Sequence, residues 1–253
     1  MNTTPIALIT GASRGLGKNT ALTLAAQGID IILTYQTNAA AAAEVVAEIE
    51  WLGRKAVALP LDVSDSGSFA EFATQVSAAL AQTWQRESFN YLINNAGIGI
   101  HVPMAETSVE QFDTLMNIHV KGPFFLTQTL LPQLMDGGSI INISTGLTRF
   151  AIPGFGAYAT MKGAVETMTQ YWAKELGPRG IRANVLAPGA IETDFGGGAV
   201  RDNEQMNQFL AQQTALGRVG LPDDIGGAIS ALLSPAAAWI NAQRIEASGG
   251  MFL

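Results

Sequence analysis

Apolar residues along this chain gather in two kinds of segment that alternate from one end to the other. The first kind is a short run rich in Ile, Val and Leu that stops at Gly, Pro, Asp or Asn, a pattern typical of a buried strand. Such runs occupy residues 5–10, 29–35, 55–62, 89–95, 138–144, 180–188 and 243–248. The second kind is longer and helical, as in residues 38–52, after which Gly53 is expected to end the helix. Repeated alternation of this kind predicts a parallel sheet with helices on both faces.

A single domain is predicted, because no linker or change of composition divides the chain. Residues 1–253 are therefore expected to form one doubly wound α/β domain with seven parallel strands. The least strand-like stretch is 192–215, which contains three consecutive glycines at 196–198. We predict that this stretch is a lid over the substrate, and the alternative is an ordinary flexible surface loop.

Composition supports a folded core and adds a prediction about assembly. Of the 253 residues, 48% are hydrophobic and only 14% are charged, which is too apolar for a disordered chain. A charged fraction this low also suggests that part of the surface is buried between subunits. We therefore expect a homo-oligomer.

Charge and rare residue types exclude several classes of function. The net charge of −7 offers no basic face to a phosphate backbone, so we expect no nucleic-acid partner. The chain has no cysteine and only two histidines, His101 and His119, so no metal site is expected. The N-terminal residues lack the pattern of a signal peptide and no apolar run approaches a membrane span, so we expect a soluble, cytoplasmic protein.

A glycine-rich turn follows the first predicted strand and precedes the first predicted helix. In "TGASRGLG", residues 10–17, the glycines are Gly11, Gly15 and Gly17. Glycine permits positive φ and lets the backbone approach a pyrophosphate, and the helix N-terminus offers free N–H groups to its oxygens. This context predicts a dinucleotide site, and the alternative is a tight turn without a ligand.

The end of the second predicted strand bears on which nucleotide is bound. Sites that prefer NAD place an acidic residue there, to accept the ribose 2′-hydroxyl. This chain instead has the uncharged residues Tyr35, Gln36, Thr37 and Asn38. Arg14, in the glycine turn, is a cation that can pair with a 2′-phosphate, or else a surface cation. We therefore predict NADP(H) in preference to NAD(H).

A tyrosine and a lysine lie four positions apart in "AYATMK", residues 157–162. On a helix this spacing places Tyr158 and Lys162 on one side, so that they can share a site. Alone, the pair has little weight, because many helices carry it by chance.

Several motifs together resemble the short-chain dehydrogenase/reductase family. They are "TGASRGLG" (10–17), "LDV" (61–63), "NNAG" (94–97), "INIS" (141–144), "YATMK" (158–162) and "APGAIET" (187–193), in the family's order and at roughly its spacing. The resemblance covers essentially the whole chain and includes reductases of 3-oxoacyl thioesters carried on acyl carrier protein. It implies a single-domain Rossmann fold, an NAD(P)-dependent reaction between a carbonyl and an alcohol, and most often a homotetramer.

The resemblance also implies catalytic roles. Tyr158 would be the acid that protonates a carbonyl oxygen, or the base in the reverse direction. Lys162 would lower the pKa of Tyr158 and bind the nicotinamide ribose. Ser144, at the end of the fifth strand, would orient and polarise the substrate carbonyl. The hydride belongs to the cofactor.

Cofactor contacts carry over in the same way. Asp62 and Val63 match positions at the adenine, 94–97 lies along the cofactor, and 188–193 surrounds the carboxamide. The expected cofactor-binding residues are Gly11, Ser13, Arg14, Gly15, Leu16, Gly17, Tyr35, Gln36, Thr37, Asp62, Val63, Asn94, Ala96, Gly97, Tyr158, Lys162, Pro188, Gly189, Ile191 and Thr193.

One position departs from the family's pattern. The family commonly adds an asparagine that holds a water in a proton relay to the lysine. In "NIHVKGPFF", counting back from Gly122 and Phe124 puts His119 at that position, whereas alignment on Asn117 needs a two-residue shift. Neutral imidazole can also hold a water. We predict either that His119 serves in the relay and adds a pH dependence near neutrality, or that it only fills space.

The sequence indicates the type of reaction more clearly than the identity of the substrate. Three residues between Tyr158 and Lys162 favour a carbonyl or alcohol over a C=C bond, since related enoyl reductases usually place the lysine farther away. Arg149 could attract an anionic substrate or lie in solvent. The apolar residues Leu147, Phe150, Ile152, Phe155 and Phe195 could line the substrate pocket, or belong to the core or an interface.

Two functions from different classes remain open. The first is an NADP(H)-dependent oxidoreductase that acts on a 3-oxoacyl thioester or another ketone. The second is a catalytically silent protein that senses NADP(H) or scaffolds an assembly. The presence of both Tyr158 and Lys162 favours the enzyme.

Overall fold

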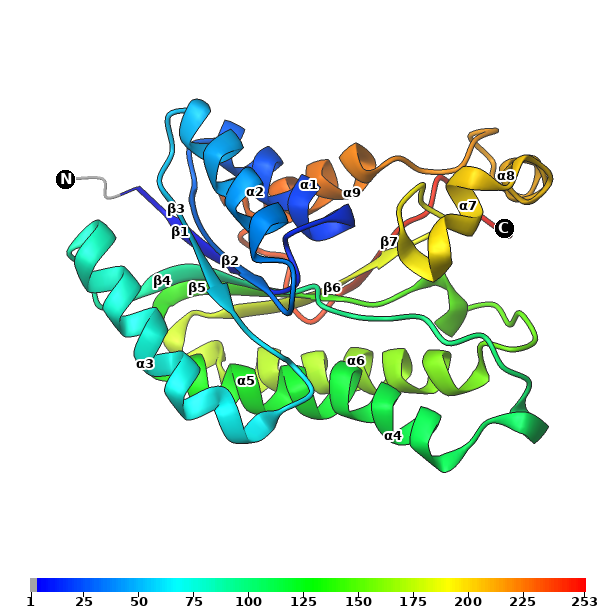
Figure 1. The fold of residues 1–253 in the computed structure, drawn as a ribbon, viewed down its shortest axis with the longest axis horizontal. Coiled ribbons are helices and arrows are strands. Elements are labelled where there is room, and N and C mark those ends of the chain that lie inside the picture. Colours follow the sequence, from blue (N-terminus) through cyan, green and yellow to red (C-terminus); the bar gives the residue numbers. More distant parts are fainter. Residues whose placement is uncertain (1–3) are drawn as a thin grey trace.

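Seven parallel strands form the centre of the protein in the computed structural model, which describes residues 4–253 (Figure 1). The strands are β1 (Ile6–Ile9), β2 (Asp30–Tyr35), β3 (Ala56–Pro60), β4 (Phe89–Asn94), β5 (Leu134–Ile143), β6 (Arg182–Pro188) and β7 (Arg244–Ala247). Their order in the sheet is β3-β2-β1-β4-β5-β6-β7. The predicted doubly wound α/β fold is confirmed, and residues 1–3 of the predicted 1–253 domain lie outside the described residues.

Two groups of helices cover the sheet. The helices are α1 (Gly15–Ala26), α2 (Ala39–Trp51), α3 (Phe69–Ala79), α4 (Val109–Met116), α5 (Gly122–Leu130), α6 (Gly156–Glu175), α7 (Ala199–Asp202), α8 (Glu204–Gln212) and α9 (Pro222–Leu233). Helices α1, α2 and α9 lie on one face, and α3, α4, α5 and α6 lie on the other (Figure 1). No helix among residues 4–253 is long and apolar enough to cross a membrane.

The alternation of side chains along the strands builds a core on each face. Ile6 and Leu8 of β1 pack with residues of α3, α5 and α6, whereas Ala7 and Ile9 pack with residues of α1, α2 and α9. All four side chains are completely buried. Because successive strand residues point to opposite faces, a strand buried on both sides is apolar throughout, as the sequence pattern indicated.

Helix α2 begins and ends at the residues that its sequence predicts. The side chain of Asn38 accepts a hydrogen bond from the Ala41 N–H at 3.0 Å and so caps the first turn. After the helix, Gly53 has a φ of +76°, in the left-handed region that favours glycine. The helix expected at 38–52 is therefore confirmed.

The direction of winding changes between β1 and β4. From β1 the chain proceeds to β2 and β3 on one side, and it then crosses to β4 on the other side of β1. Ligands of doubly wound folds bind at such a change, beyond the carboxyl ends of the strands. The segments that follow β1, β4, β5 and β6 are therefore expected to meet in one site.

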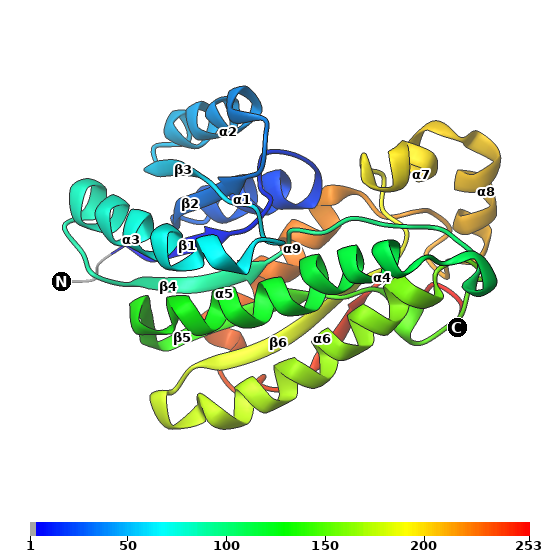
Figure 2. The ribbon, with the colours of Figure 1, turned by 60° about the horizontal axis from the view of Figure 1, so that its bottom comes forward.

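The segment 192–215 is mostly helical. It comprises a short 3₁₀ turn at Phe195–Gly198 followed by α7 and α8. Gly196, Gly197 and Gly198 have φ values of +61°, +76° and +80°, which explains the run of glycines. Figure 2 shows α7 and α8 at the same end of the molecule as the C-terminus, apart from the helices that cover the sheet.

Candidate active site

Tyr158 and Lys162 lie one turn apart on α6 and are both buried. Only 6% of Tyr158 and 5% of Lys162 is exposed. The Lys162 Nζ donates a hydrogen bond to the Ile143 carbonyl oxygen at 2.7 Å, at the end of β5. The same Nζ lies 5.7 Å from the centroid of the Tyr158 ring. The structure therefore brings the pair together at the carboxyl edge of the sheet, where a bound dinucleotide would end.

Burial controls the protonation of this pair. It raises the pKa of Tyr158 well above its ordinary value, and a hydrogen bond with the Thr145 side chain opposes that rise. Burial also lowers the pKa of Lys162 to about 7. We expected Lys162 to lower the pKa of Tyr158. In the protein alone the pKa is raised instead, because the loss of water around the phenol has the larger effect. Tyr158 is therefore protonated at neutral pH, as a proton donor must be.

Ser144 and Thr145 are adjacent after β5, but their hydroxyl groups have different partners. The Ser144 hydroxyl donates to Oε1 of Glu166 at 2.7 Å. Because a carboxylate only accepts, this bond uses the single proton of that hydroxyl. The Thr145 side chain, in contrast, is near enough to Tyr158 to lower the pKa of that phenol. The Ser144 hydroxyl thus has a protein partner, and Thr145, which sequence reasoning missed, is a second candidate to orient the substrate carbonyl.

Ser144 and Thr145 lie after the end of β5 and reach different positions of α6. Asn142 points toward α6, where its side-chain amide donates to Thr169 at 2.8 Å. Ser144, two positions later, points the same way and reaches Glu166. Thr145, which also lies after the end of β5, is near Tyr158 of the same helix. The position of α6 relative to the end of β5 therefore decides which of the two hydroxyl groups is near Tyr158.

His119 is buried next to Tyr158 and Lys162. It is 1% exposed, and its ring centroid lies 5.3 Å from that of Tyr158. Its Nε2 lies 2.8 Å from the Ile98 carbonyl oxygen. Because a carbonyl can only accept, Nε2 carries the proton and Nδ1 is the acceptor of a neutral ring. Among the described residues, no group hydrogen-bonds to this buried Nδ1.

The predicted titration of His119 near neutrality is wrong. Burial, and then the nearby Lys162, lower the pKa of His119 to about 3, although the hydrogen bond to Ile98 opposes this. The imidazole therefore remains neutral throughout the range in which Tyr158 and Lys162 work. A pH dependence of turnover from His119 is not expected.

A small cavity separates His119 from Lys162. It leaves about 10 Å³ for the centre of a water molecule, which is close to what one water needs. Besides these two residues, Asn94 and Asn142 contribute to its lining. Within residues 4–253, Oδ1 of Asn94 is a second buried acceptor without a partner. The cavity is thus polar enough and large enough for one bound water.

A π-helical turn at Asn117–Lys121 interrupts the run from α4 to α5 and turns His119 inward. Asn117 is only half-buried. Gly122 then packs so tightly that an added Cβ would lie 2.3 Å from the Val63 carbonyl oxygen. The alignment counted back from Gly122, which selects His119, therefore agrees with the structure better than the alignment on Asn117.

The glycine turn fits a pyrophosphate. Gly11 and Gly15 have φ values of +64° and +56°, and an added Cβ on Gly17 would lie 2.4 Å from the Gly11 carbonyl oxygen. Helix α1 begins at Gly15, and in the described chain no side chain caps it and no acidic residue lies in its first turn. Its first N–H groups are therefore available to phosphate oxygens.

The expected adenosine end of the site lies at β2 and β3. Tyr35 is half-buried, whereas Gln36, Thr37 and Arg14 are exposed. The Gln36 side chain donates to Asp62 at 3.0 Å, which ties the ends of the two strands together. Asn94 has a structural part, since its side-chain amide donates to Thr127 and Asn142 in the interior.

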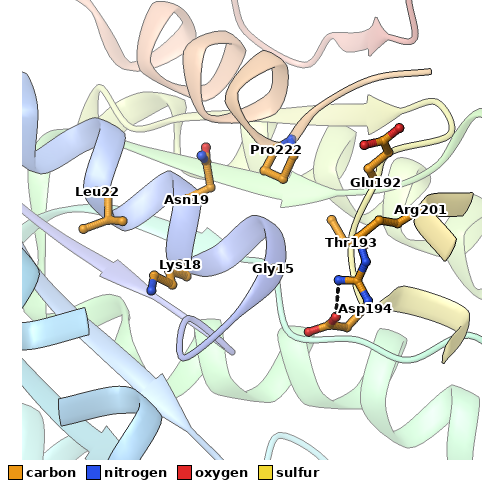
Figure 3. A pocket seen from close by; sticks show the side chains of 9 residues that line it. All are labelled: Gly15, Lys18, Asn19, Leu22, Glu192, Thr193, Asp194, Arg201 and Pro222. Atoms are coloured by element: carbon orange, nitrogen blue, oxygen red, sulfur yellow. Dashed lines mark hydrogen bonds and ion pairs between the residues drawn. The ribbon is translucent and has the colours of Figure 1, made fainter. Parts of the chain in front are cut away.

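A cleft of about 270 Å³ lies between α1 and the segment after β6 (Figure 3). Thr193 and Gly15 face each other across it, and Arg201 reaches Asp194 at 2.6 Å and Asp202 at 2.7 Å. The ion pair between Arg201 and Asp194 joins residues on the two sides of the Phe195–Gly198 turn. The cleft is lined by Gly15, Lys18, Asn19, Leu22, Glu192, Thr193, Asp194, Arg201 and Pro222.

Aromatic rings gather around Tyr158. The ring centroids of Phe195 and Phe155 lie 5.9 Å and 6.4 Å from that of Tyr158, and His101 packs against Phe155 at 4.7 Å. An added Cβ on Gly99 would lie 2.7 Å from the Phe195 ring, so Gly99 makes room for that ring. The catalytic tyrosine thus lies beneath an apolar, aromatic surface.

Of the other apolar candidates, Leu147 packs against the cluster that contains Tyr158, whereas Phe150 lies elsewhere. Phe150 packs against Phe252, with ring centroids 4.7 Å apart, and belongs to a cluster at the C-terminus. Arg149 neither faces a substrate nor lies free in solvent, because it forms two hydrogen bonds with Glu246 at 2.9 Å and 2.7 Å. It also donates to backbone carbonyls near the C-terminus.

This arrangement defines a class of protein. A doubly wound sheet with a phosphate-binding glycine turn holds a dinucleotide, and a buried tyrosine and lysine at the far end of that site can exchange a proton with a substrate oxygen. Together these features are those of a nicotinamide-dependent oxidoreductase.

Comparison with known proteins agrees with this class. A family model described as enoyl-(acyl carrier protein) reductase matches residues 11–252. An uncharacterized oxidoreductase of Methylorubrum extorquens is 36% identical over 246 residues, which cover 97% of both chains. Tetrahydroxynaphthalene reductase PfmaG of Pestalotiopsis fici is 36% identical over 256 residues, which cover 97% of this chain and 90% of the relative.

Two solved structures extend the comparison. The promiscuous reductase LugOII, which catalyses keto-reduction at C1 during lugdunomycin biosynthesis, has a TM-score of 0.94 at 37% identity and 99% coverage of both chains. The angucycline C-6 ketoreductase LanV, with bound NADP, has a TM-score of 0.93 at 35% identity, with 99% of this chain and 97% of that chain covered. The chain therefore belongs to the short-chain dehydrogenase/reductase family. It is an oxidoreductase of C=O and CH–OH groups that uses a nicotinamide cofactor.

Proposed function

We propose that this protein is an NADPH-dependent reductase of a ketone on a flat, fused-ring substrate. The observation that carries the proposal is the aromatic surface that Phe155 and Phe195 form beside Tyr158. Flat rings pack well on such a surface, whereas a flexible acyl chain gains less from it. The names of the relatives support the same class, since they include a tetrahydroxynaphthalene reductase and two ketoreductases of polycyclic products.

In this proposal, Tyr158 donates the proton to the carbonyl oxygen and Thr145 orients that oxygen. Burial keeps Tyr158 protonated, and the Thr145 hydroxyl lies at the same point of the site. Thr145 thus has the role that the sequence assigned to Ser144. When bound, the nicotinamide supplies the hydride. The 3-oxoacyl thioester remains a second candidate substrate.

We propose that His119 holds a water that returns the proton toward Tyr158. His119, whose buried Nδ1 has no partner among the described residues, and Lys162 both line the cavity that has room for one water. A neutral imidazole can accept from that water without repelling Lys162, and the low pKa of His119 keeps it neutral.

We propose NADP(H) rather than NAD(H) as the cofactor. Arg14 is exposed beside the glycine turn, and within residues 4–253 no carboxylate pairs with it. Gln36 occupies the place of the acidic residue that would repel a 2′-phosphate. LanV and a short-chain dehydrogenase of Burkholderia cenocepacia, whose solved structures contain NADP, support this choice by similarity.

Three further assignments are also proposals. We propose that residues 192–215 act as the substrate lid, because Phe195 of this segment packs toward Tyr158. A homotetramer is proposed from the low charged fraction and the family resemblance, and a cytoplasmic location from the same resemblance. Sedimentation of the purified protein would test the tetramer.

Initial rates with a panel of ketones test the function. The panel pairs 1-tetralone, a bicyclic aromatic ketone, with an acetoacetyl thioester, each with NADPH and NADH. We expect the highest kcat/KM for tetralone with NADPH. Turnover of the thioester alone would overturn the substrate class and keep the chemistry. Retained NADPH binding without turnover of any ketone would favour the catalytically silent alternative.

A further inference from the structure

The Glu166 carboxylate collects hydrogen bonds from three side chains next to the active site. Its Oε1 accepts from Ser144 Oγ at 2.7 Å, Thr148 Oγ1 at 2.8 Å and Arg244 Nε at 2.8 Å. Two of the donors belong to the loop after β5 and the third to β7, which lies beyond β6 in the sheet. The cluster includes neither Tyr158 nor any of the residues that are expected to bind the cofactor.

The same cluster holds the backbone on both sides of Thr145. Ser144 precedes Thr145, and Thr148 ends the 3₁₀ turn that follows it. Arg244 also donates from one terminal nitrogen to the Thr145 carbonyl oxygen at 3.0 Å and to Thr148 Oγ1 at 3.1 Å. Thr145 is therefore the centre of a backbone segment that Glu166 and Arg244 bind at three points.

Glu166 connects this segment to the helix that carries the catalytic pair. It lies on α6, one turn after Lys162 and two turns after Tyr158, so the three residues occupy neighbouring positions along one side of the helix. A hydrogen bond from the Thr145 loop to Glu166 therefore fixes the loop relative to Tyr158. Thr145 and Tyr158 come from different elements, and Glu166 is a direct link between those elements.

The ionic character of the link makes it rigid. The side chains of Glu166 and Arg244 are only 19% and 24% exposed, so their 2.8 Å ion pair is partly shielded from water. Charge-assisted hydrogen bonds are shorter and stronger than neutral ones. A buried charged group that loses its hydrogen-bond partner destabilises the folded protein. Arg244 is held in turn by Glu246 at 3.0 Å.

We propose that Glu166, together with Arg244, is a positioning residue that directs the Thr145 hydroxyl toward the oxygen that Tyr158 protonates. This inference rests on the proposed reduction of a ketone. Glu166 contacts neither substrate nor cofactor and acts through Thr145. The competing interpretation is that the cluster only anchors the C-terminal segment, since Arg149 and Arg244 share Glu246.

A double-mutant cycle in kcat separates these interpretations. Glu166→Gln keeps the size of the side chain and removes its charge, and we expect it to lower kcat by about tenfold to a hundredfold, because small misplacements of catalytic groups have effects of this size. If Glu166 acts through Thr145, adding Glu166→Gln to Thr145→Ala lowers kcat by less than about twofold more. Multiplied effects in the double variant would overturn the proposal. KM for NADPH is expected to stay unchanged, because the change is remote from the glycine turn.

Two further variants serve as controls for the double-mutant cycle. Glu175→Gln changes an exposed glutamate at the end of the same helix and is expected to leave kcat unchanged. If Glu166→Gln does not fold, Ser144→Ala removes one of the three hydrogen bonds with little change in volume. It is expected to lower kcat less than Glu166→Gln, and again to have no added effect when Thr145 is already alanine.

Hydrogen exchange tests the inference without turnover. In Glu166→Gln we expect faster exchange at the Leu147 and Phe150 amides, which donate to Thr145 Oγ1 and to the Gly146 carbonyl oxygen. Faster exchange in a protein that reduces no ketone would mean that the proposed function fails while the link stands. Unchanged exchange at both amides would overturn the link itself.

Discussion

The Thr145 side chain is near enough to Tyr158 to lower the pKa of that phenol, whereas Ser144, its neighbour in sequence, donates a hydrogen bond to Glu166. Two adjacent residues with the same functional group therefore have different tasks. In the proposed mechanism, Thr145 contacts the reacting oxygen and Ser144 helps to hold the Thr145 loop in place. This relationship gives the most direct test of the active site.

Thr145→Ala is expected to lower kcat by about a hundredfold or more, because it removes a hydroxyl that contacts the reacting oxygen. Ser144→Ala is expected to lower kcat by about tenfold or less, since it weakens only the support. Thr145→Ser keeps the hydroxyl and should retain most activity. Steady-state kinetics of the three variants at saturating NADPH would decide the matter, and a larger loss in Ser144→Ala would restore Ser144 as the catalytic hydroxyl.

Tyr158→Phe removes the proton donor and leaves the ring in place. We expect kcat to fall by about a thousandfold, within the range for loss of general acid catalysis. NADPH binding, measured by fluorescence titration, should be retained because the glycine turn is untouched. Turnover near that of the wild type would rule out Tyr158 as the proton donor.

His119 is expected to affect stability at low pH and not the pH dependence of turnover. Its pKa is about 3 in the folded protein and ordinary in the unfolded chain, so between these values the unfolded chain binds more protons. Stability relative to His119→Asn should therefore be complete above about pH 6.5 and fall as the pH decreases, by at most about 1.4 kcal/mol per pH unit. Urea unfolding at pH 7, 5.5 and 4.5 measures this difference.

The rate profile of His119→Asn provides the complementary check. We expect a lower kcat if the relay water is held less well, with the same dependence on pH between 6 and 9. A new inflection in the wild type that disappears in His119→Asn would show that His119 titrates in this range after all.

Arg14 is expected to discriminate between the two nicotinamide cofactors. Arg14→Ala should raise KM for NADPH by about tenfold, because a charge-assisted bond to the 2′-phosphate is lost. KM for NADH should change little, and NADH serves as the internal control. An equal increase for both cofactors would mean that Arg14 supports the turn and does not recognise the phosphate.

Gly99→Ala tests the contact between Gly99 and the proposed lid. The added Cβ would meet the end of the Phe195 ring at 2.7 Å, and this flexible side chain can move away at small cost in stability. We expect KM for a bicyclic ketone to rise while KM for NADPH is unchanged. Gly227→Ala, within α9 and with open space around its Cβ, is the matched control and should stabilise the protein by about 0.5–1 kcal/mol. Identical KM values in wild type and Gly99→Ala would mean that Phe195 does not contact the substrate.

Local rules in the sequence determined much of this protein. Apolar runs and their flanking residues identified all seven strands, the helical pattern of residues 38–52 with Gly53 located α2, and the glycine turn was recognisable from its place between a strand and a helix. The helical period alone placed Tyr158 and Lys162 on one side of α6. These features depend on neighbours within a few residues, so the linear order of residues carries them.

The tertiary structure decided what depends on contacts between distant elements. The choice of Thr145 over Ser144 depends on where α6 lies relative to the end of β5. The neutrality of His119 depends on burial beside Lys162, and the pairing of Arg149 with Glu246 joins a loop to the last strand. Hydroxyl, imidazole and guanidinium groups can each have several partners, and only packing removes the alternatives, because it determines which partner is near and how much water remains.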